Sequence, residues 1–196
     1  MEIADLGERI VDIQSRLGLQ APNYYKKGLT SVELLQIRMF QGQRDDSELH
    51  DFYKWRNGMD DSAAPMDYLW MRPGYYWMSA QDSVRENAYA QNALEDWQEN
   101  FYPIFTNGGG GRYFVKCKPS LNVKVPIFIY EPYSDPVIEQ IYDGIKSMLS
   151  CVLSCYERRV YTFPSDGLLR TDFKAEVEIC RNLNPKSDYW NRKNLY

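Results

Sequence analysis

Residues 103–131 read PIFTNGGGGRYFVKCKPSLNVKVPIFIYE, and this stretch decides the expected fold. Apolar runs rich in aromatic and β-branched residues at 103–107, 112–117 and 125–131 have the length and composition of strands. Gly108 to Gly111 separate the first two runs, and glycine readily adopts the positive φ values of tight hairpin turns. The stretch therefore predicts antiparallel strands that follow one another along the chain.

Two more strands are expected upstream of this stretch, near 67–71 and 75–78. Both segments are aromatic, and Arg72-Pro73-Gly74 between them is typical of a turn. Together with segments near 103–106, 112–118 and 125–130, they predict a mostly antiparallel, twisted sheet of about five strands.

Helices are expected ahead of these strands. An N-terminal helix over 5–17, ended by Gly18, carries apolar residues at helical spacing: Leu6, Ile10, Ile13 and Leu17. Thr30 and Glu33 form a capping-box pattern for a second helix, whose apolar set is Val32, Leu35 and Met39. A short third helix starts at Asp46 or Ser47, and we expect Asn57-Gly58 to end it in a left-handed conformation.

Helices are also expected between and after the strands. Ser79 and Asp82 begin one whose inner face carries Val84, Ala88, Leu94 and Trp97. A strongly periodic helix is expected over 138–155, with four buried residues: Ile141, Ile145, Leu149 and Val152. A last helix contains Phe173, Val177 and Cys180. This order, with hairpin-length links between strands, predicts a single α+β domain over residues 1–196 with helices packed against the sheet.

Charge and cysteine content narrow the class of protein. A net charge of −4 disfavours nucleic-acid binding, which depends on neutralising phosphates. The N-terminus has no cationic start followed by an apolar run, and no stretch approaches the roughly 20 apolar residues of a membrane span. Four scattered cysteines make no disulfide framework. We therefore expect a cytoplasmic protein with free thiols, no membrane segment and no nucleic-acid partner.

No pattern in the sequence predicts catalysis. His50 is the only histidine, and no recognisable nucleophile motif accompanies it, so we expect a surface or half-buried helical histidine. Cys151 and Cys155 share a helix face, but a closed zinc site needs four ligands, so core packing is the preferred interpretation. Gly108 to Gly111 lack the Gly-Lys-Ser/Thr ending of a phosphate-binding loop. We expect no catalytic residue, no metal and no cofactor.

Acidic residues gather between positions 45 and 61: Asp45, Asp46, Glu48, Asp51, Asp60 and Asp61. One interpretation is a solvated helix, since acids near a helix N-terminus are favoured by its dipole. The other is a partner-facing patch that steers a basic protein toward it. Three aromatic residues flank the acids and would act as anchors in such a patch: Tyr53, Trp55 and Tyr68.

Several short motifs, taken in order, resemble the SUKH superfamily, which includes a fungal cell-wall synthesis regulator and many bacterial toxin-immunity proteins. They are Trp55 with Asn57-Gly58 after an early helix, Tyr76-Trp77-Met78-Ser79, and Tyr102-Pro103 followed by Gly110-Gly111 and a strand. The resemblance covers about 30–160, with a helical extension after 163. Asp45-Asp46-Ser47-Glu48-Leu49 replaces the family's usual Leu-Pro-x-Asp-Tyr.

The resemblance implies a non-enzymatic protein-binding domain, a cytoplasmic immunity protein that neutralises a secreted polymorphic toxin, such as a nuclease, by direct binding. Oligomeric state stays open. Two alternatives remain. One is a regulatory adaptor in cell-wall or envelope assembly, as in the fungal members. The other is a binder of a small ligand or peptide in an aromatic cleft made of Tyr68, Trp70, Tyr75, Tyr76 and Trp77.

Overall fold

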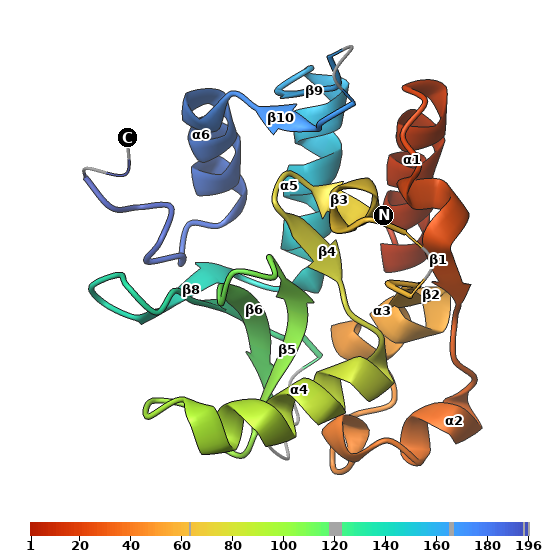
Figure 1. The fold of residues 1–196 in the computed structure, drawn as a ribbon, viewed down its shortest axis with the longest axis vertical. Coiled ribbons are helices and arrows are strands. Elements are labelled where there is room, and N and C mark those ends of the chain that lie inside the picture. Colours follow the sequence, from red (N-terminus) through yellow and green to blue (C-terminus); the bar gives the residue numbers. More distant parts are fainter. Residues whose placement is uncertain (63, 118–122, 165–166, 194, 196) are drawn as a thin grey trace.

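A six-stranded antiparallel sheet forms the centre of the protein, as shown by a computed structural model that describes residues 1–62, 64–117, 123–164, 167–193 and 195 (Figure 1). Neighbours in the sheet are also neighbours in strand order along the chain. Its strands are β3 (Trp70–Arg72), β4 (Tyr75–Trp77), β5 (Phe101–Thr106), β6 (Arg112–Lys116), β7 (Ile127–Tyr130) and β8 (Ile138–Tyr142). The chain is therefore an α+β protein with a mostly antiparallel sheet, as the sequence predicted.

Two small sheets complete the strands of the described residues. β1 (Tyr25–Lys27) pairs with β2 (Arg56–Met59), and β9 (Tyr161–Thr162) pairs with β10 (Arg170–Thr171), both antiparallel. The helices are α1 (Ile3–Arg16), α2 (Ser31–Leu35), α3 (Glu48–Trp55), α4 (Ala80–Ala93), α5 (Ile145–Glu157) and α6 (Phe173–Leu183). Short 3-10 helices are η1 (Ala21–Tyr24), η2 (Arg38–Phe40) and η3 (Met66–Leu69).

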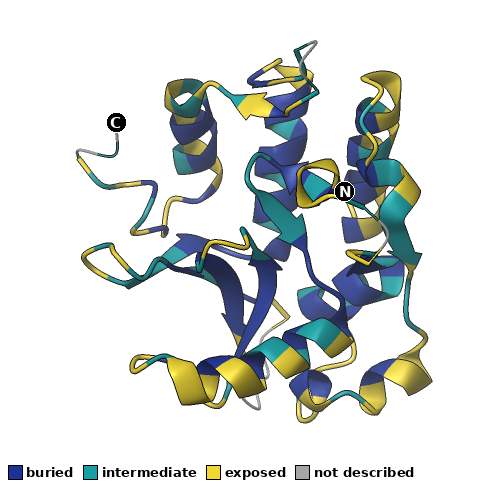
Figure 2. Cartoon of the chain, viewed as in Figure 1, coloured by how far each residue is buried: buried dark blue, intermediate teal, exposed yellow. Residues whose placement is uncertain are grey.

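The central sheet is covered on both faces. On β6, Tyr113 and Val115 point into the main core, while Phe114 belongs to a second cluster with Trp97 and Phe101. This alternation follows from the two-residue period of a strand. α5 packs between α1 and α6, and α4 packs along β5 (Figure 1). β5 and β6 are buried along almost their whole length, whereas α2 and α4 expose much of their surface (Figure 2).

Local capping patterns are found where the sequence placed them. Thr30 and Glu33 form the expected capping box at α2. The side chains of Ser47 and Ser79 accept backbone hydrogen bonds at the starts of α3 and α4. Gly18 has a φ of +75° just past α1, and Leu19 N–H donates to the Gln14 carbonyl, which completes a Schellman motif.

The prediction of one helix over 138–155 is wrong for its first part. Residues 138–142 form β8, which pairs with β7 through Ile129↔Glu139 and Tyr130↔Ile138, and the helix begins at Ile145. Ile141, Ile145, Leu149 and Val152 are all buried, as expected. A strand followed by a sharp turn thus placed apolar residues at spacings that also fit one helix.

Other expectations fail for tertiary reasons. Val32 and Leu35 are exposed, because the single turn of α2 buries Leu34 instead. On α4 the inner face carries Ala80, Ser83, Asn87 and Ala90, so Ala88 faces solvent. The first strand was expected near 67–71, but residues 66–69 form η3. The first strand of the sheet therefore begins at Trp70.

The helices of the described residues are too short or too polar to cross a lipid bilayer.

Candidate protein-binding surface

The segment around α3 carries most of the residues expected to bind a partner. Ser47 Oγ lies 2.8 Å from His50 Nδ1, and both side chains are buried. His50 packs against the ring of Phe40 at 4.9 Å. The histidine is therefore a core residue of the α3 N-terminus, more deeply buried than the sequence predicted, and burial lowers its pKa.

Glu48 stabilises another helix. Its Oε2 accepts hydrogen bonds from the backbone N–H of Ile145 (2.8 Å) and Val125 (3.4 Å). Gly144 precedes α5 and has no side chain that could cap it, so the carboxylate from α3 satisfies an N–H that the helix leaves unpaired. Burial raises the pKa of Glu48, and the backbone donors oppose that shift. Glu48 thus has a structural role within the predicted acidic patch. Ser47, Glu48 and His50 form what we name the Ser47 cluster.

Asp45, Asp46 and Asp51 form the part of the patch open to solvent, and we name them the acidic surface. The side chain of Asp45 is 81% exposed and that of Asp46 is 62% exposed. Asp51 on α3 is partly exposed. Arg44 donates two hydrogen bonds to Asp46, which lowers the pKa of that carboxyl. Asp46 therefore favours its ionised form.

Asp60 and Asp61 follow β2, beyond the other end of α3. The side chain of Asp60 accepts hydrogen bonds from Ser62, which lower the pKa of Asp60. Its main-chain N–H donates to the Tyr24 carbonyl. Asp61 is exposed. The structure thus divides the predicted acidic cluster between the two ends of α3.

Two of the three predicted aromatic anchors belong to the core. Tyr53 is fully buried, and its hydroxyl donates to the Met78 carbonyl. Trp55 is buried, stacks on Trp77 at 5.5 Å and donates its indole N–H to Glu8. The expectation that these two rings form anchors at the surface is therefore corrected. Tyr53 and Trp55 lie on the face of α3 that packs against the core, so neither ring is exposed to a partner.

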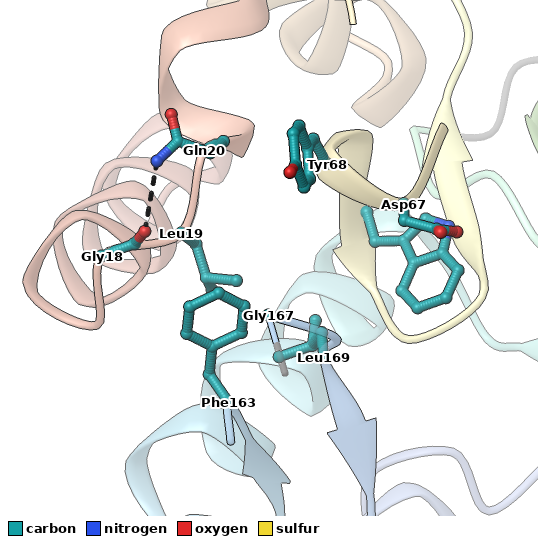
Figure 3. Close-up of a pocket in the computed structure, with 9 residues that line it drawn as sticks. Gly18, Leu19, Gln20, Asp67, Tyr68, Phe163, Gly167 and Leu169 are labelled. Carbon is teal, nitrogen blue, oxygen red and sulfur yellow. Dashed lines mark hydrogen bonds between the residues drawn. The ribbon is translucent and has the colours of Figure 1, made fainter. Parts of the chain in front are cut away.

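Tyr68, the third predicted anchor, lines a surface hollow of about 230 Å³ (Figure 3). We name it the Tyr68 hollow. Leu19, Phe163 and Leu169 also line it, and Figure 3 shows that these side chains come from the end of α1 and from the β9–β10 hairpin. Gln20 and Asp67 supply polar groups to its wall. Three separate parts of the chain therefore build this hollow.

A larger groove of about 590 Å³ lies beside the hollow and shares Phe163 with it. We name it the β9 groove. Its lining combines side chains from the ends of α1 and α5 with those of β9: Ile13, Arg16, Leu17, Tyr156, Glu157, Arg159, Tyr161, Thr162 and Phe163. Apolar walls with a few charged groups are typical of peptide-binding and ligand-binding sites.

The expected aromatic cleft is only partly formed. Tyr68 and Trp70 line the Tyr68 hollow. Trp77 is instead buried and stacked on Phe52, with ring centroids 3.8 Å apart. Tyr75 stacks on Tyr113 of the central sheet. Phe163, which the sequence analysis passed over, takes the place of these rings, and no local pattern marks it.

The Asn57-Gly58 motif connects β2 to α4 and does not cap α3. The Asn57 Oδ1 accepts a hydrogen bond from Ala80 N–H at 2.9 Å. Gly58 has the expected positive φ of +69°, but it lies within β2. A Cβ there would lie 2.4 Å from the Met78 carbonyl carbon and the Ser79 nitrogen, so the close approach of two backbones requires glycine.

The remaining motif residues shape the hairpin of β5 and β6. Tyr102 is buried, and Pro103 lies at an irregularity in the register, where a residue without an N–H is tolerated. Gly110 has a φ of +106°. The Asn107 Oδ1 accepts a hydrogen bond from Gly111 N–H, which closes the turn. These four residues therefore shape the hairpin.

The thiols are packing groups. Cys151, Cys155 and Cys180 are free and buried where α5 meets α6. A hydrogen bond with Cys180, together with burial, raises the pKa of Cys155, and burial raises that of Cys180. Protonated thiols are poor nucleophiles and poor metal ligands. Among the described residues, no cluster of three or more His, Cys, Asp or Glu could hold a metal ion.

An internal ion pair has no counterpart in the sequence analysis. Arg72 Nη2 donates to Glu176 Oε1 at 2.8 Å, with side chains 8% and 0% exposed. Tyr161 and Thr171 also donate to this carboxylate, and Arg72 lies over the ring of Tyr113. We name Arg72, Tyr161, Thr171 and Glu176 the Arg72 cluster. It joins the β3–β4 turn to α6.

Comparison with known proteins adds no family assignment: no protein-family model matches the chain, and no curated protein matches it.

Proposed function

We propose that this chain is a non-enzymatic protein-binding domain that works as an immunity protein, neutralising a secreted toxin by direct binding through the acidic surface. One observation carries the proposal: the segment from Asp45 to Asp51 turns Ser47, Glu48 and His50 inward and its three Asp side chains outward. Ser47 and His50 contact each other, and Glu48 caps α5. Asp45, Asp46 and Asp51 face solvent.

A surface of this kind favours a basic partner. Nucleases need positive charge to hold phosphates, so carboxylates on an antidote increase both its association rate and its specificity. Such steering acts over a Debye length of about 8 Å at physiological salt and weakens as salt increases. The motif resemblance to the SUKH superfamily supports the same role.

The test first asks whether a toxin domain is encoded beside this chain's gene, and then uses that domain. Cells that express the toxin domain should stop growing, and co-expression of this chain should restore their growth. Surface binding kinetics between the two proteins should show an association rate that falls as the salt concentration increases. The triple variant Asp45→Lys/Asp46→Lys/Asp51→Lys should slow association by about tenfold or more and change dissociation less.

A matched triple variant, Glu95→Lys/Asp96→Lys/Glu178→Lys, changes net charge equally at exposed acids outside the acidic surface. It should lower the on-rate much less. Equal association rates for the two triple variants would show that the acidic surface is not the binding site. Failure to restore growth would refute the immunity role, and envelope-biogenesis genes in place of a toxin gene would favour the regulatory adaptor.

A further inference from the structure

The Tyr68 hollow is lined mainly by aromatic and aliphatic side chains. Tyr68, Trp70 and Phe163 supply three rings, and Leu19 and Leu169 supply aliphatic surface. Figure 3 shows Tyr68 and Phe163 on opposite sides of the open space. In the described part of the chain, none of the three rings stacks on another aromatic ring. Space therefore remains between the rings for a ligand.

The hollow is lined by one carboxylate and by no cation. Asp67 precedes Tyr68 in η3, and its side chain is exposed. Figure 3 shows both side chains on the η3 side of the hollow. No described residue forms an ion pair or a hydrogen bond with the Asp67 carboxylate. The hollow therefore offers a negative charge that no neighbouring cation neutralises.

Aromatic rings beside an unpaired carboxylate favour a cationic ligand. The face of an aromatic ring attracts a cation that lies within about 6 Å of the ring centroid, and tryptophan does so most strongly. The carboxylate adds direct Coulomb attraction at the rim. The two effects act on the same ligand, because Asp67 and the three rings line one hollow.

The lining also indicates which kind of cation fits. The ammonium group of lysine and the guanidinium group of arginine carry several N–H donors, and each donor that loses water needs an acceptor. Among the side chains that line the hollow, only Asp67, Gln20 and the Tyr68 hydroxyl have oxygen acceptors. A quaternary ammonium group has no N–H and needs none. The volume of about 230 Å³ suits such a head group, since drug-sized ligands usually occupy about 300–1,000 Å³.

We propose that the Tyr68 hollow binds a quaternary ammonium group among the rings of Tyr68, Trp70 and Phe163, with Asp67 as its counter-charge. Free choline-like molecules and trimethylated lysine side chains both carry this group, and the experiment distinguishes these two sources. The site is separate from the acidic surface and does not depend on the immunity role, so either proposal can fail alone.

The first experiment titrates the full, isotope-labelled chain with choline and follows its NMR signals. Amide signals of Leu19, Tyr68 and Gly167 should shift and saturate. The matched probe is the uncharged carbon analogue of choline, in which a carbon atom replaces the nitrogen. It has the same shape and should bind about tenfold more weakly or worse, because the attraction of the rings and of Asp67 depends on the charge.

The second experiment identifies the source of the group. It compares choline with two capped peptides that are identical except for one trimethyl-lysine or one unmodified lysine. The trimethyl-lysine peptide should bind about tenfold more tightly than the lysine peptide. Tighter binding of that peptide than of choline assigns the site to a methylated protein, and the reverse order assigns it to a free small molecule. Equal binding of the two peptides would contradict the proposal.

Variants of the lining separate ring and charge effects. Tyr68→Leu should weaken choline binding about tenfold, whereas Tyr68→Phe keeps the ring and should bind like wild type. Asp67→Asn should weaken choline binding, by a factor that shrinks as salt increases, and should leave binding of the carbon analogue unchanged. The controls Tyr89→Leu and Asp61→Asn change exposed residues outside the hollow and should bind normally.

Three further results would overturn the proposal. Equal binding of choline and its carbon analogue would show an apolar hollow without selectivity for a cation. Equal binding by Tyr68→Leu and Tyr68→Phe would show that the ring does not hold the ligand. Signal changes confined to the acidic surface would show that choline is attracted only by exposed carboxylates there.

Discussion

The Arg72–Glu176 ion pair and the Ser47–His50 contact are both buried and polar, but they join residues at very different distances along the chain. Arg72 and Glu176 are 104 positions apart, whereas Ser47 and His50 are three apart. Ser47 is the N-cap of α3. It was one of the two candidates from sequence, Asp46 or Ser47, because serine is favoured at that position. Nothing near Arg72 indicates that it needs Glu176. The contrast shows that local polar contacts leave a recognisable pattern, whereas distant ones do not.

The largest effect is expected from breaking the Arg72 cluster. Glu176→Ala should lower the free energy of unfolding by about 3–5 kcal/mol, because it leaves a buried guanidinium without its carboxylate. Denaturant unfolding measures this loss. The double variant Arg72→Met/Glu176→Leu removes both charges and should recover much of the stability. A double variant as unstable as Glu176→Ala would show that the ion pair is not the cause.

A smaller loss is expected at Glu48, the member of the Ser47 cluster that reaches α5. Glu48→Ala should cost about 1–2 kcal/mol, because the N–H groups of Ile145 and Val125 lose their acceptor. Asp51→Ala is the matched control on the same helix and should change stability by less than about 0.5 kcal/mol. Similar losses for the two variants would mean that Glu48 does not cap α5.

The Ser47 cluster should also respond to pH. Burial lowers the pKa of His50 in the folded protein below its ordinary value of about 6.5. The unfolded chain therefore binds a proton more readily, and the free energy of unfolding should fall as pH decreases from about 6.5 toward the folded-state pKa. Comparing wild type with His50→Gln across this range separates the effect of His50 from that of the carboxylates. Parallel pH profiles would contradict the assignment.

The smallest effect on stability is expected at the acidic surface. The single change Asp45→Lys should alter the free energy of unfolding by no more than about 0.5 kcal/mol, because this side chain is solvated. Thermal unfolding of the variant measures this. A loss comparable to that of Glu48→Ala would place the carboxylate in the folding core and not on a binding surface.

Much of the fold followed from sequence alone, because local geometry determines it. The apolar runs of 103–131, the glycine turn and the caps at Thr30, Ser47 and Ser79 each depend on residues within a few positions of one another. These patterns were sufficient for an α+β fold with a mostly antiparallel sheet. They failed at 138–142. There the apolar residues of β8 and of α5, on either side of Gly144, have the spacing expected of one continuous helix.

The candidate sites depended more heavily on tertiary structure. The sequence placed Asp45, Asp46 and Asp51 together with Tyr53 and Trp55, yet one side of α3 faces water and the other faces the core. The Tyr68 hollow combines the end of α1, η3 and the β9–β10 hairpin, which only folding brings together. Short-range backbone preferences are present in any local segment. Burial, ion pairing and surface hollows depend on which distant segments pack against one another, and only the folded chain decides that.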